Sequence, residues 1–304
     1  MNKFEVVMIG NTAVGKTSML SVLAKELKKY NKAGRLQLKP TSSEFDILEG
    51  KWNELLKQVE NNDEFQPVTA KLDGTAEPIE HPFEFRVEGK KKCDVVFVDT
   101  PGIFTRKRNE ELIERVNHAF GVFCVVDAAV LMECAESRNN ELNCPAFVHE
   151  ILEQVYSDGD KYQPTFIAFI LTKCEKYMST KSGRDRLAEK FQSSYGDVID
   201  MLKSPNIEQT PKIYMLAIQT MGSVQFAELD ENNEPVFMVV EKSLTPKDCA
   251  YPLVLLLRNL ITVLDRKKGW FTRLKELLRI ENPLTEYLAV IEKSVKKPAL
   301  YKAL

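Results

Sequence analysis

The stretch that decides the fold is Gly10-Asn11-Thr12-Ala13-Val14-Gly15-Lys16-Thr17, near the start of the 304 residues. An apolar run at residues 4–9 precedes it and predicts a buried strand. After Lys16 the leucines follow a helical period, so the stretch connects a strand to a helix. Short apolar runs and amphipathic helices then alternate along the chain, which predicts an α/β fold with a mainly parallel sheet.

The spacing Gly-x4-Gly-Lys-Thr between a strand and a helix is typical of a phosphate-binding loop, the P-loop. Glycines let the backbone curl so that successive N–H groups face phosphate oxygens, and the helix N-terminus adds partial positive charge. We expect Lys16 to reach the β- and γ-phosphates of a nucleotide and the Thr17 hydroxyl to ligate Mg²⁺. Ser18 follows in the first helical turn and belongs to the same predicted nucleotide-binding set.

The remaining apolar runs predict the other strands of the sheet. They lie at residues 82–87, 94–98, 121–126, 164–171 and 212–218. Together with the first strand they make a mostly parallel six-stranded sheet, with residues 82–87 as its one antiparallel edge strand. Helices on both faces would complete a three-layer α/β fold.

Two segments fall outside this alternation. A helical period places an inserted helix at about 43–61, within an insertion at about 40–66. Residues 226–240 are polar and are expected to form a small hairpin. We predict one domain over residues 1–265, followed by a helical extension over residues 266–304.

Composition and charge exclude several functional classes. Apolar residues make up 44% and charged residues 28%, which is ordinary for a globular protein, and the net charge of −2 argues against nucleic-acid binding. The longest apolar stretch, residues 251–264, is too short for a membrane span, and the N-terminal run is too short for a signal peptide. The six cysteines show no C-x-x-C spacing and the three histidines no ligand spacing. These features predict a cytoplasmic protein without disulfides.

A second motif follows the predicted strand at residues 94–98 and reads Asp99-Thr100-Pro101-Gly102. The end of that strand should lie beside the phosphate loop, where Asp99 would hold Mg²⁺ through a water molecule. The backbone N–H of Gly102 would meet the γ-phosphate. With both motifs in place, the sequence resembles the Ras-like branch of the P-loop GTPases, which implies a Ras-like G domain, GTP or GDP as ligand, and Mg²⁺.

The resemblance extends to the base-binding motif, with one departure. The family has Asn-Lys-x-Asp or Thr-Lys-x-Asp after the next-but-one strand, and here Thr172 and Lys173 match while Glu175 replaces the aspartate. In the family that carboxylate pairs with the guanine edge and the lysine stem covers the ring. Glutamate is one methylene longer and makes the same pairing only if the loop backs off. A polar pocket selects a base only when its geometry is right, so ATP stays open as an alternative. The family's last base-contacting turn corresponds in position to Ala217 and Ile218.

Two further site residues come from the family's switch segments. The resemblance assigns Thr75, in Asp-Gly-Thr before the residue 82–87 strand, to Mg²⁺ and the γ-phosphate, with Thr69 in reserve. Ile103 stands where Ras-like enzymes carry the glutamine that orients water, so we expect slow or partner-stimulated hydrolysis. Arg106 is our candidate for neutralising transition-state charge, and a solvated, charged helix start is the alternative. Asp127, after another strand, is interpreted as a turn or packing residue.

We therefore expect a GTP-dependent switch and GTPase whose switch loops bind an effector or regulatory protein, with a nucleotide-dependent homo-oligomer as a further option. An ATPase with the same phosphate site is one alternative. The other is an adaptor that binds nucleotide without turnover and docks a partner through its C-terminal helices. The Gly-Thr-x-x-Pro segment at residue 74, the insertion and the altered base motif are most similar to bacterial double-GTPase conflict-system proteins.

Overall fold

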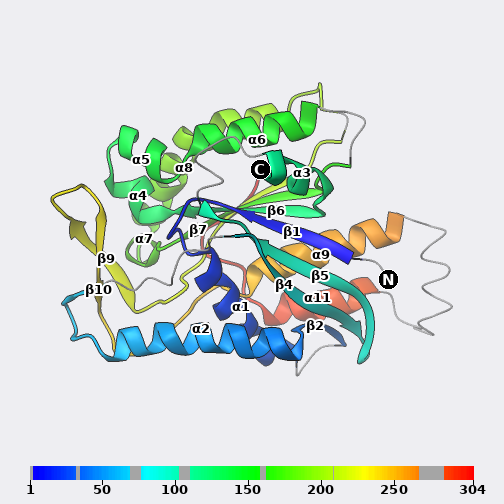
Figure 1. Cartoon of the computed structure of the whole chain (residues 1–304), viewed down its shortest axis with the longest axis horizontal. Coiled ribbons are helices and arrows are strands. Elements are labelled where there is room, and N and C mark those ends of the chain that lie inside the picture. The colour runs from blue at the N-terminus through cyan, green and yellow to red at the C-terminus, as the bar shows by residue number, and fades with distance from the viewer. Residues whose placement is uncertain are drawn as a thin grey trace.

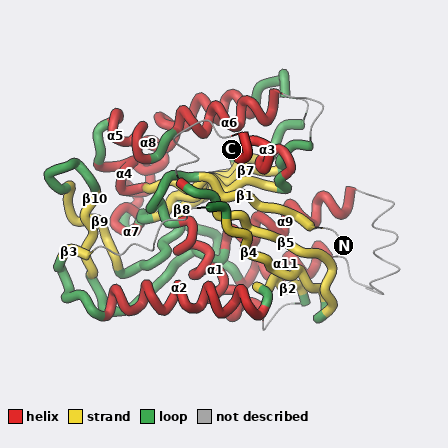
Figure 2. The backbone as a smooth tube through the Cα atoms, in the orientation of Figure 1, coloured by secondary structure: helices red, strands yellow, loops and turns green. Residues whose placement is uncertain are grey.

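The computed structural model describes residues 3–31, 35–68, 77–102, 110–157, 162–207, 209–266 and 284–304. Its centre is an eight-stranded sheet with helices on both faces, so the described chain forms three layers (Figures 1 and 2). The strand order is β11-β8-β7-β6-β1-β5-β4-β2. The bounds are β1 Lys3–Ile9, β2 Leu36–Pro40, β4 Ile79–Val87, β5 Lys90–Asp99, β6 Gly121–Asp127, β7 Phe166–Thr172, β8 Lys212–Ala217 and β11 Tyr301–Ala303.

Five neighbouring strands, from β5 through β1, β6 and β7 to β8, run parallel. Every residue of β6 and β7 is buried, because helices cover both faces of the sheet there. Because these strands are parallel, their carboxyl ends lie at the same end of the sheet. The predicted phosphate loop and the other predicted site segments begin there. The mainly parallel α/β sheet predicted from the sequence is confirmed.

The prediction of six strands with residues 82–87 at the edge was wrong. The strand containing them, β4, lies between β5 and β2, and β11 is added beyond β8. The β2 strand has only two buried leucines, Leu36 and Leu38, and β11 has three residues, so neither carries a strong sequence signal. The extension predicted as helical therefore contributes a strand to the main sheet.

Two layers of helices cover the sheet. One face carries α1 (Lys16–Asn31), α2 (Ser42–Glu60), α9 (Tyr251–Arg266) and α11 (Leu284–Ser294). The other carries α3 (Glu110–His118), α4 (Ala128–Glu133), α6 (Pro145–Ser157), α7 (Glu175–Met178) and α8 (Lys181–Leu202), with α5 (Glu136–Leu142) next to α4. The inserted helix expected at about 43–61 is α2.

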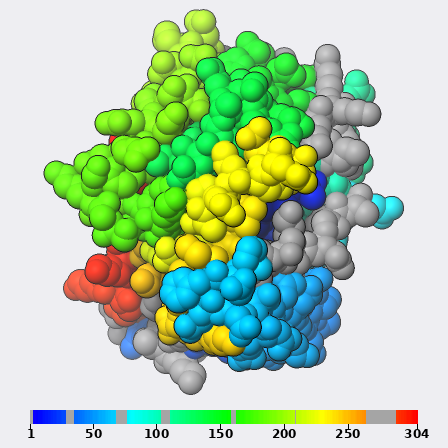
Figure 3. Space-filling view, turned by 90° about the vertical axis from the view of Figure 1, so that its left-hand side faces the viewer, coloured from blue at the N-terminus to red at the C-terminus, as the bar shows by residue number. Residues whose placement is uncertain are grey.

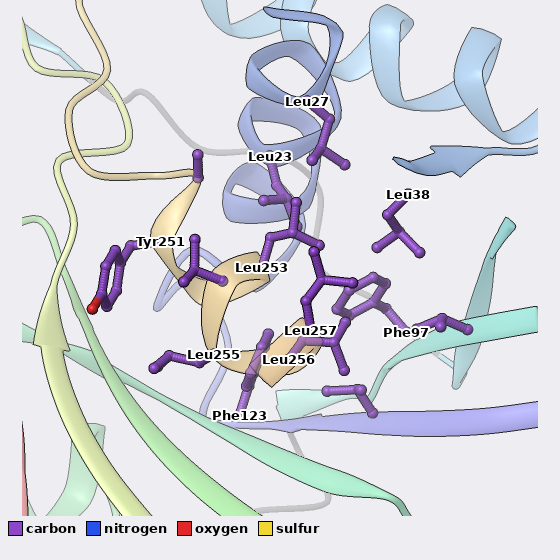
Figure 4. Close-up of a cluster of buried hydrophobic side chains, with 14 of the residues drawn as sticks. Leu23, Leu27, Leu38, Phe97, Phe123, Tyr251, Leu253, Leu255, Leu256 and Leu257 are labelled. Atoms are coloured by element: carbon purple, nitrogen blue, oxygen red, sulfur yellow. The ribbon is translucent and has the colours of Figure 1, made fainter. Parts of the chain in front are cut away.

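The apolar stretch at residues 251–264 forms α9, which is buried on most of its circumference. Figure 4 shows its leucines between the leucines of α1 and the phenylalanines of the central strands. A helix enclosed in this way has little need of a polar face, which accounts for its long apolar sequence. Within the described ranges, no helix is long and apolar enough to cross a membrane.

A second, three-stranded sheet lies at the carboxyl ends of the parallel strands (Figure 1). It has the order β3-β10-β9, with bounds Pro67–Val68 for β3, Val224–Leu229 for β9 and Pro235–Val239 for β10. The hairpin predicted at residues 226–240 is thus confirmed as β9 and β10. Leu55 and Val59 of α2 pack against Val224 and Val239, which joins the inserted helix to the hairpin.

Candidate functional site

The predicted phosphate loop, residues 10–15, lies between the end of β1 and the start of α1. Gly15 adopts a φ of 99°, and Ala13 a φ of 64°, so the backbone curls as a phosphate cradle requires. The buried Lys16 side chain folds back over the loop, and its Nζ donates to the carbonyl oxygens of Gly10 at 2.7 Å and Asn11 at 3.1 Å. Burial lowers the pKa of Lys16, while the nearby Asp99 raises it.

Thr17 and Asp99 meet beside this loop. Thr17 Oγ1 donates to Asp99 Oδ2 at 2.5 Å, and Asp99 is the last residue of β5, paired in register with Met8 of β1. A hydroxyl and a carboxylate are oxygen ligands that fit Mg²⁺, which usually takes one or two protein groups and completes its shell with water and phosphate. The described residues contain no cluster of three or more His, Cys, Asp or Glu side chains that would bind a metal alone.

Residues 99–102 dock directly on the phosphate loop. Thr100 Oγ1 donates to the Met8 carbonyl oxygen at 2.6 Å. A Cβ added at Gly102 would lie 2.0 Å from Thr12 N and 2.3 Å from Thr12 Oγ1, so only glycine allows this approach. The backbone at Gly102 therefore lies against the predicted phosphate site.

Thr172 and Lys173 also reach the loop, from the end of β7. Thr172 Oγ1 donates to the Val14 carbonyl oxygen at 2.6 Å. Lys173 adopts a φ of 52°, and its Nζ lies 2.5 Å from Asp127 Oδ2. The other Asp127 oxygen caps α4 by accepting from the Ala129 and Val130 amides. The structure therefore places Asp127, interpreted from sequence as a turn or packing residue, both at a helix cap and beside Lys173.

A cavity of about 80 Å³ opens between Ala13 of the phosphate loop, Lys173 and Asp127. Its remaining wall includes Pro235 and Phe237 from β10. This is where a nucleobase would lie if phosphates occupied the loop and the Lys173 stem covered the base. The sequence did not place the hairpin here, because hydrophobic periodicity does not tell where a hairpin packs.

Glu175 lies apart from this cavity. It is the first residue of α7 and is buried, and its Oε1 accepts from the backbone amides of Met221 at 3.3 Å and Gly222 at 3.2 Å. Burial raises its pKa to about 7, against the opposing effect of these backbone hydrogen bonds. The carboxylate expected to contact a base therefore contacts the protein's own backbone.

The Ala217–Ile218 turn is likewise engaged within the fold. The Ala217 amide donates to the Leu300 carbonyl oxygen and the Ile218 amide to that of Leu171. Both side chains are fully buried. These two amides are therefore used in hydrogen bonds to Leu300 and to Leu171 of β7. The turn shortly precedes the loop at Met221 and Gly222 that contacts Glu175.

The turn after α5 is hydrogen-bonded both to the predicted phosphate loop and to the end of β6. Asn11 Nδ2 donates to the Leu142 carbonyl oxygen at 2.9 Å. Asn143 Oδ1 accepts from the Asp127 amide at 2.9 Å, and Asn143 Nδ2 donates to the Asp127 carbonyl oxygen at 3.0 Å. Asn11 belongs to the predicted nucleotide-binding set, whereas the sequence did not point to Asn143, because residues 128–144 lack a clear periodicity.

The remaining predicted site residues are one serine at the start of α1 and four residues of the two predicted switch segments. Ser18 is half-buried in the first turn of α1, and its carbonyl oxygen accepts from Ser21 Oγ at 2.8 Å. Thr75 and Arg106 lie outside the described residues. So do Thr69 and Ile103.

No protein-family model matches the chain, and no curated protein matches it significantly.

The burial of Glu175 predicts a pH effect on stability. With a pKa raised from 4.5 to about 7, the folded protein keeps a proton that the unfolded chain loses. This contribution to stability is complete below pH 4.5 and is lost as the pH rises through 7. Glu175→Gln should therefore gain stability relative to the wild type between pH 5 and pH 8, by about 3 kcal/mol at most.

Urea unfolding of the wild type and of Glu175→Gln at pH 5 and at pH 8 measures this gain in stability. Glu189→Gln, at an exposed position of α8, is the matched control and should show little change. A stability difference between wild type and Glu175→Gln that does not vary with pH would contradict the prediction.

Proposed function

We propose that the chain is a Mg²⁺-dependent, GTP-binding P-loop GTPase that acts as a nucleotide-controlled switch with slow intrinsic hydrolysis. The observation that carries the proposal is the 2.5 Å hydrogen bond between Thr17 Oγ1 and Asp99 Oδ2. These residues are 82 positions apart, and the fold brings them together beside a helix N-terminus and a curled, lysine-capped loop. That combination is what binding of a metal-bound triphosphate requires.

The residues of the site have distinct roles in the proposal. Lys16, which donates to two loop carbonyls in this structure, would transfer those hydrogen bonds to β- and γ-phosphate oxygens. Thr17 and Asp99 would hold Mg²⁺, directly and through water. A Mg²⁺ ion held by these two residues would supply positive charge to neutralise the phosphate oxygens. The Gly102 amide would contact the γ-phosphate.

The slow turnover and the switch rest on sequence. Ile103 cannot orient an attacking water, and Arg106, the first arginine after Gly102 in the sequence, is our candidate for stabilising transition-state charge. Both follow Gly102, which lies against the loop at Thr12, so a γ-phosphate contact there would bias the segment after it. An effector or regulatory protein, or a second copy of the chain, would bind at this segment and at the one containing Thr75.

A second candidate, an ATP-binding P-loop NTPase, is favoured by the position of Glu175. Its carboxylate accepts hydrogen bonds from Met221 and Gly222 and does not line the cavity beside Lys173. With Glu175 directed away, the carboxylate that the motif would place at the N1 and N2 edge of guanine is missing from the cavity, which weakens the choice of GTP over ATP.

Identification of the bound nucleotide tests the proposal. The purified protein is denatured, the released nucleotide is identified by chromatography, and GTP and ATP affinities are then compared with Mg²⁺ present. We expect GTP or GDP in the released fraction and slow single-turnover hydrolysis of GTP. Bound ATP, or equal affinity for the two, would support the second candidate instead. Tight GTP binding with no turnover would indicate a nucleotide-stabilised adaptor.

A further inference from the structure

The cavity beside Lys173 has a wall that comes from the β9–β10 hairpin, and the Phe237 ring belongs to this wall. Lys173 Nζ lies over this ring, 5.1 Å from its centroid, and both residues line the cavity. The ring is half-buried, so part of it remains accessible. An aromatic face and a lysine stem at the same small cavity are suited to a flat, aromatic ligand.

The hairpin is held at this place by contacts from several elements. Near its tip, Arg138 of α5 forms an ion pair with Glu234 at 2.7 Å. At its base, Lys176 of α7 lies 4.4 Å from the centroid of the Phe226 ring. With the packing on α2, these contacts fix the position of Phe237 relative to the phosphate loop. A wall held from three sides is a pre-organised surface for a ligand.

The space-filling view shows how the hairpin sits over the candidate site. In Figure 3 the yellow hairpin lies between the green helices above and the light-blue α2 below, with dark-blue atoms of the first part of the chain beside it. Thr12, Ala13 and Val14 of the predicted phosphate loop line the same cavity as Pro235 and Phe237 of the hairpin. A nucleotide with its phosphates on that loop would therefore have its base next to the hairpin.

We propose that the β9–β10 hairpin forms the outer wall of the nucleobase site and that Phe237 covers the base. The proposal rests on the proposed nucleotide binding and adds the element that holds the base. A ring face contacts any purine, so Phe237 contributes affinity for the base and little choice between guanine and adenine. Glu175 then has its structural role in holding the loop at Met221 and Gly222.

The test separates the base from the phosphates. Affinities for GTP, ATP and inorganic tripolyphosphate, each with Mg²⁺, are measured by calorimetry on the full chain. Phe237→Ala should weaken GTP and ATP binding by about ten-fold or more and leave tripolyphosphate binding unchanged. Val236→Ala, the neighbouring position that does not line the cavity, is the matched control and should bind all three ligands as the wild type does.

A second variant guards against loss of the fold. Phe237→Trp should retain nucleotide affinity, and the fluorescence of the new indole should change on addition of nucleotide but not of tripolyphosphate. Equal losses for nucleotide and tripolyphosphate in Phe237→Ala would show a purely structural role and overturn the inference. Unchanged nucleotide affinity would overturn it too, while leaving nucleotide binding intact. If the wild type binds none of the three ligands, the proposed function itself fails.

Discussion

Replacement of Lys16 by alanine should remove nearly all nucleotide binding. The side chain is buried, with 6% of its surface exposed, and its ammonium already donates to the Gly10 and Asn11 carbonyls at the centre of the loop. Bound phosphates would be left without their buried counter-charge, which typically costs several kcal/mol. We expect the affinity for GTP to fall by about 100-fold or more.

Calorimetric titration with GTP and Mg²⁺ measures this loss. Lys25→Ala is the matched control, because Lys25 lies on the same helix and pairs with Glu49 of α2 at 3.5 Å, away from the loop. The control should bind nucleotide normally. If Lys16→Ala, still folded by circular dichroism, retains wild-type affinity, the assignment of the phosphate loop is wrong.

The second large effect concerns stability and a pair of residues far from the loop. Glu44 Oε1 lies 2.7 Å from His81 Nδ1, and the two side chains are only 5% and 3% exposed. The pair joins the first turn of α2 to β4. Glu44→Ala would leave the buried imidazole without this partner, and among the described residues its Nε2 has no hydrogen-bond partner either. We expect the free energy of unfolding to fall by about 3 kcal/mol.

Urea denaturation measures this fall. Glu54→Ala, at a partly exposed position of the same helix, is the control and should cost far less. A double variant, Glu44→Leu with His81→Phe, replaces both polar groups and should recover part of the loss. If the single variant is as stable as the control, the buried pair contributes little to the attachment of α2.

The central sheet and the phosphate loop were predictable because their signals are local. The apolar residues of β1, the spacing of Gly10, Gly15 and Lys16, and the leucines of α1 follow one another directly, so the sequence orders strand, loop and helix without reference to the rest of the chain. The run 95–98 ending in Asp99 gave the second strand of the site in the same way. Completely buried parallel strands are long apolar runs, which sequence analysis detects readily.

Other features were decided by contacts between distant segments. The edge strands β2 and β11 are short, and their pairing with β4 and β8 depends on backbone hydrogen bonds that any sequence can make. The motif at residues 172–175 predicted a carboxylate at a base, but burial and the Met221 and Gly222 amides direct Glu175 elsewhere. A motif gives residue types and spacing, whereas the direction of a side chain depends on which polar groups surround it.

The sequence by itself determined the strand–loop–helix unit at the start of the chain, our predicted phosphate cradle, and the mainly parallel α/β sheet that contains it. Only the tertiary structure decided what stands around the cradle: Asp99 against Thr17, Asp127 against Lys173, and Phe237 at the wall of the adjoining cavity. The physical reason is one of range. Periodicity and backbone conformation act over a few residues. Asp127 lies 46 positions from Lys173 and Asp99 lies 82 positions from Thr17, so each pair meets only when the layers pack.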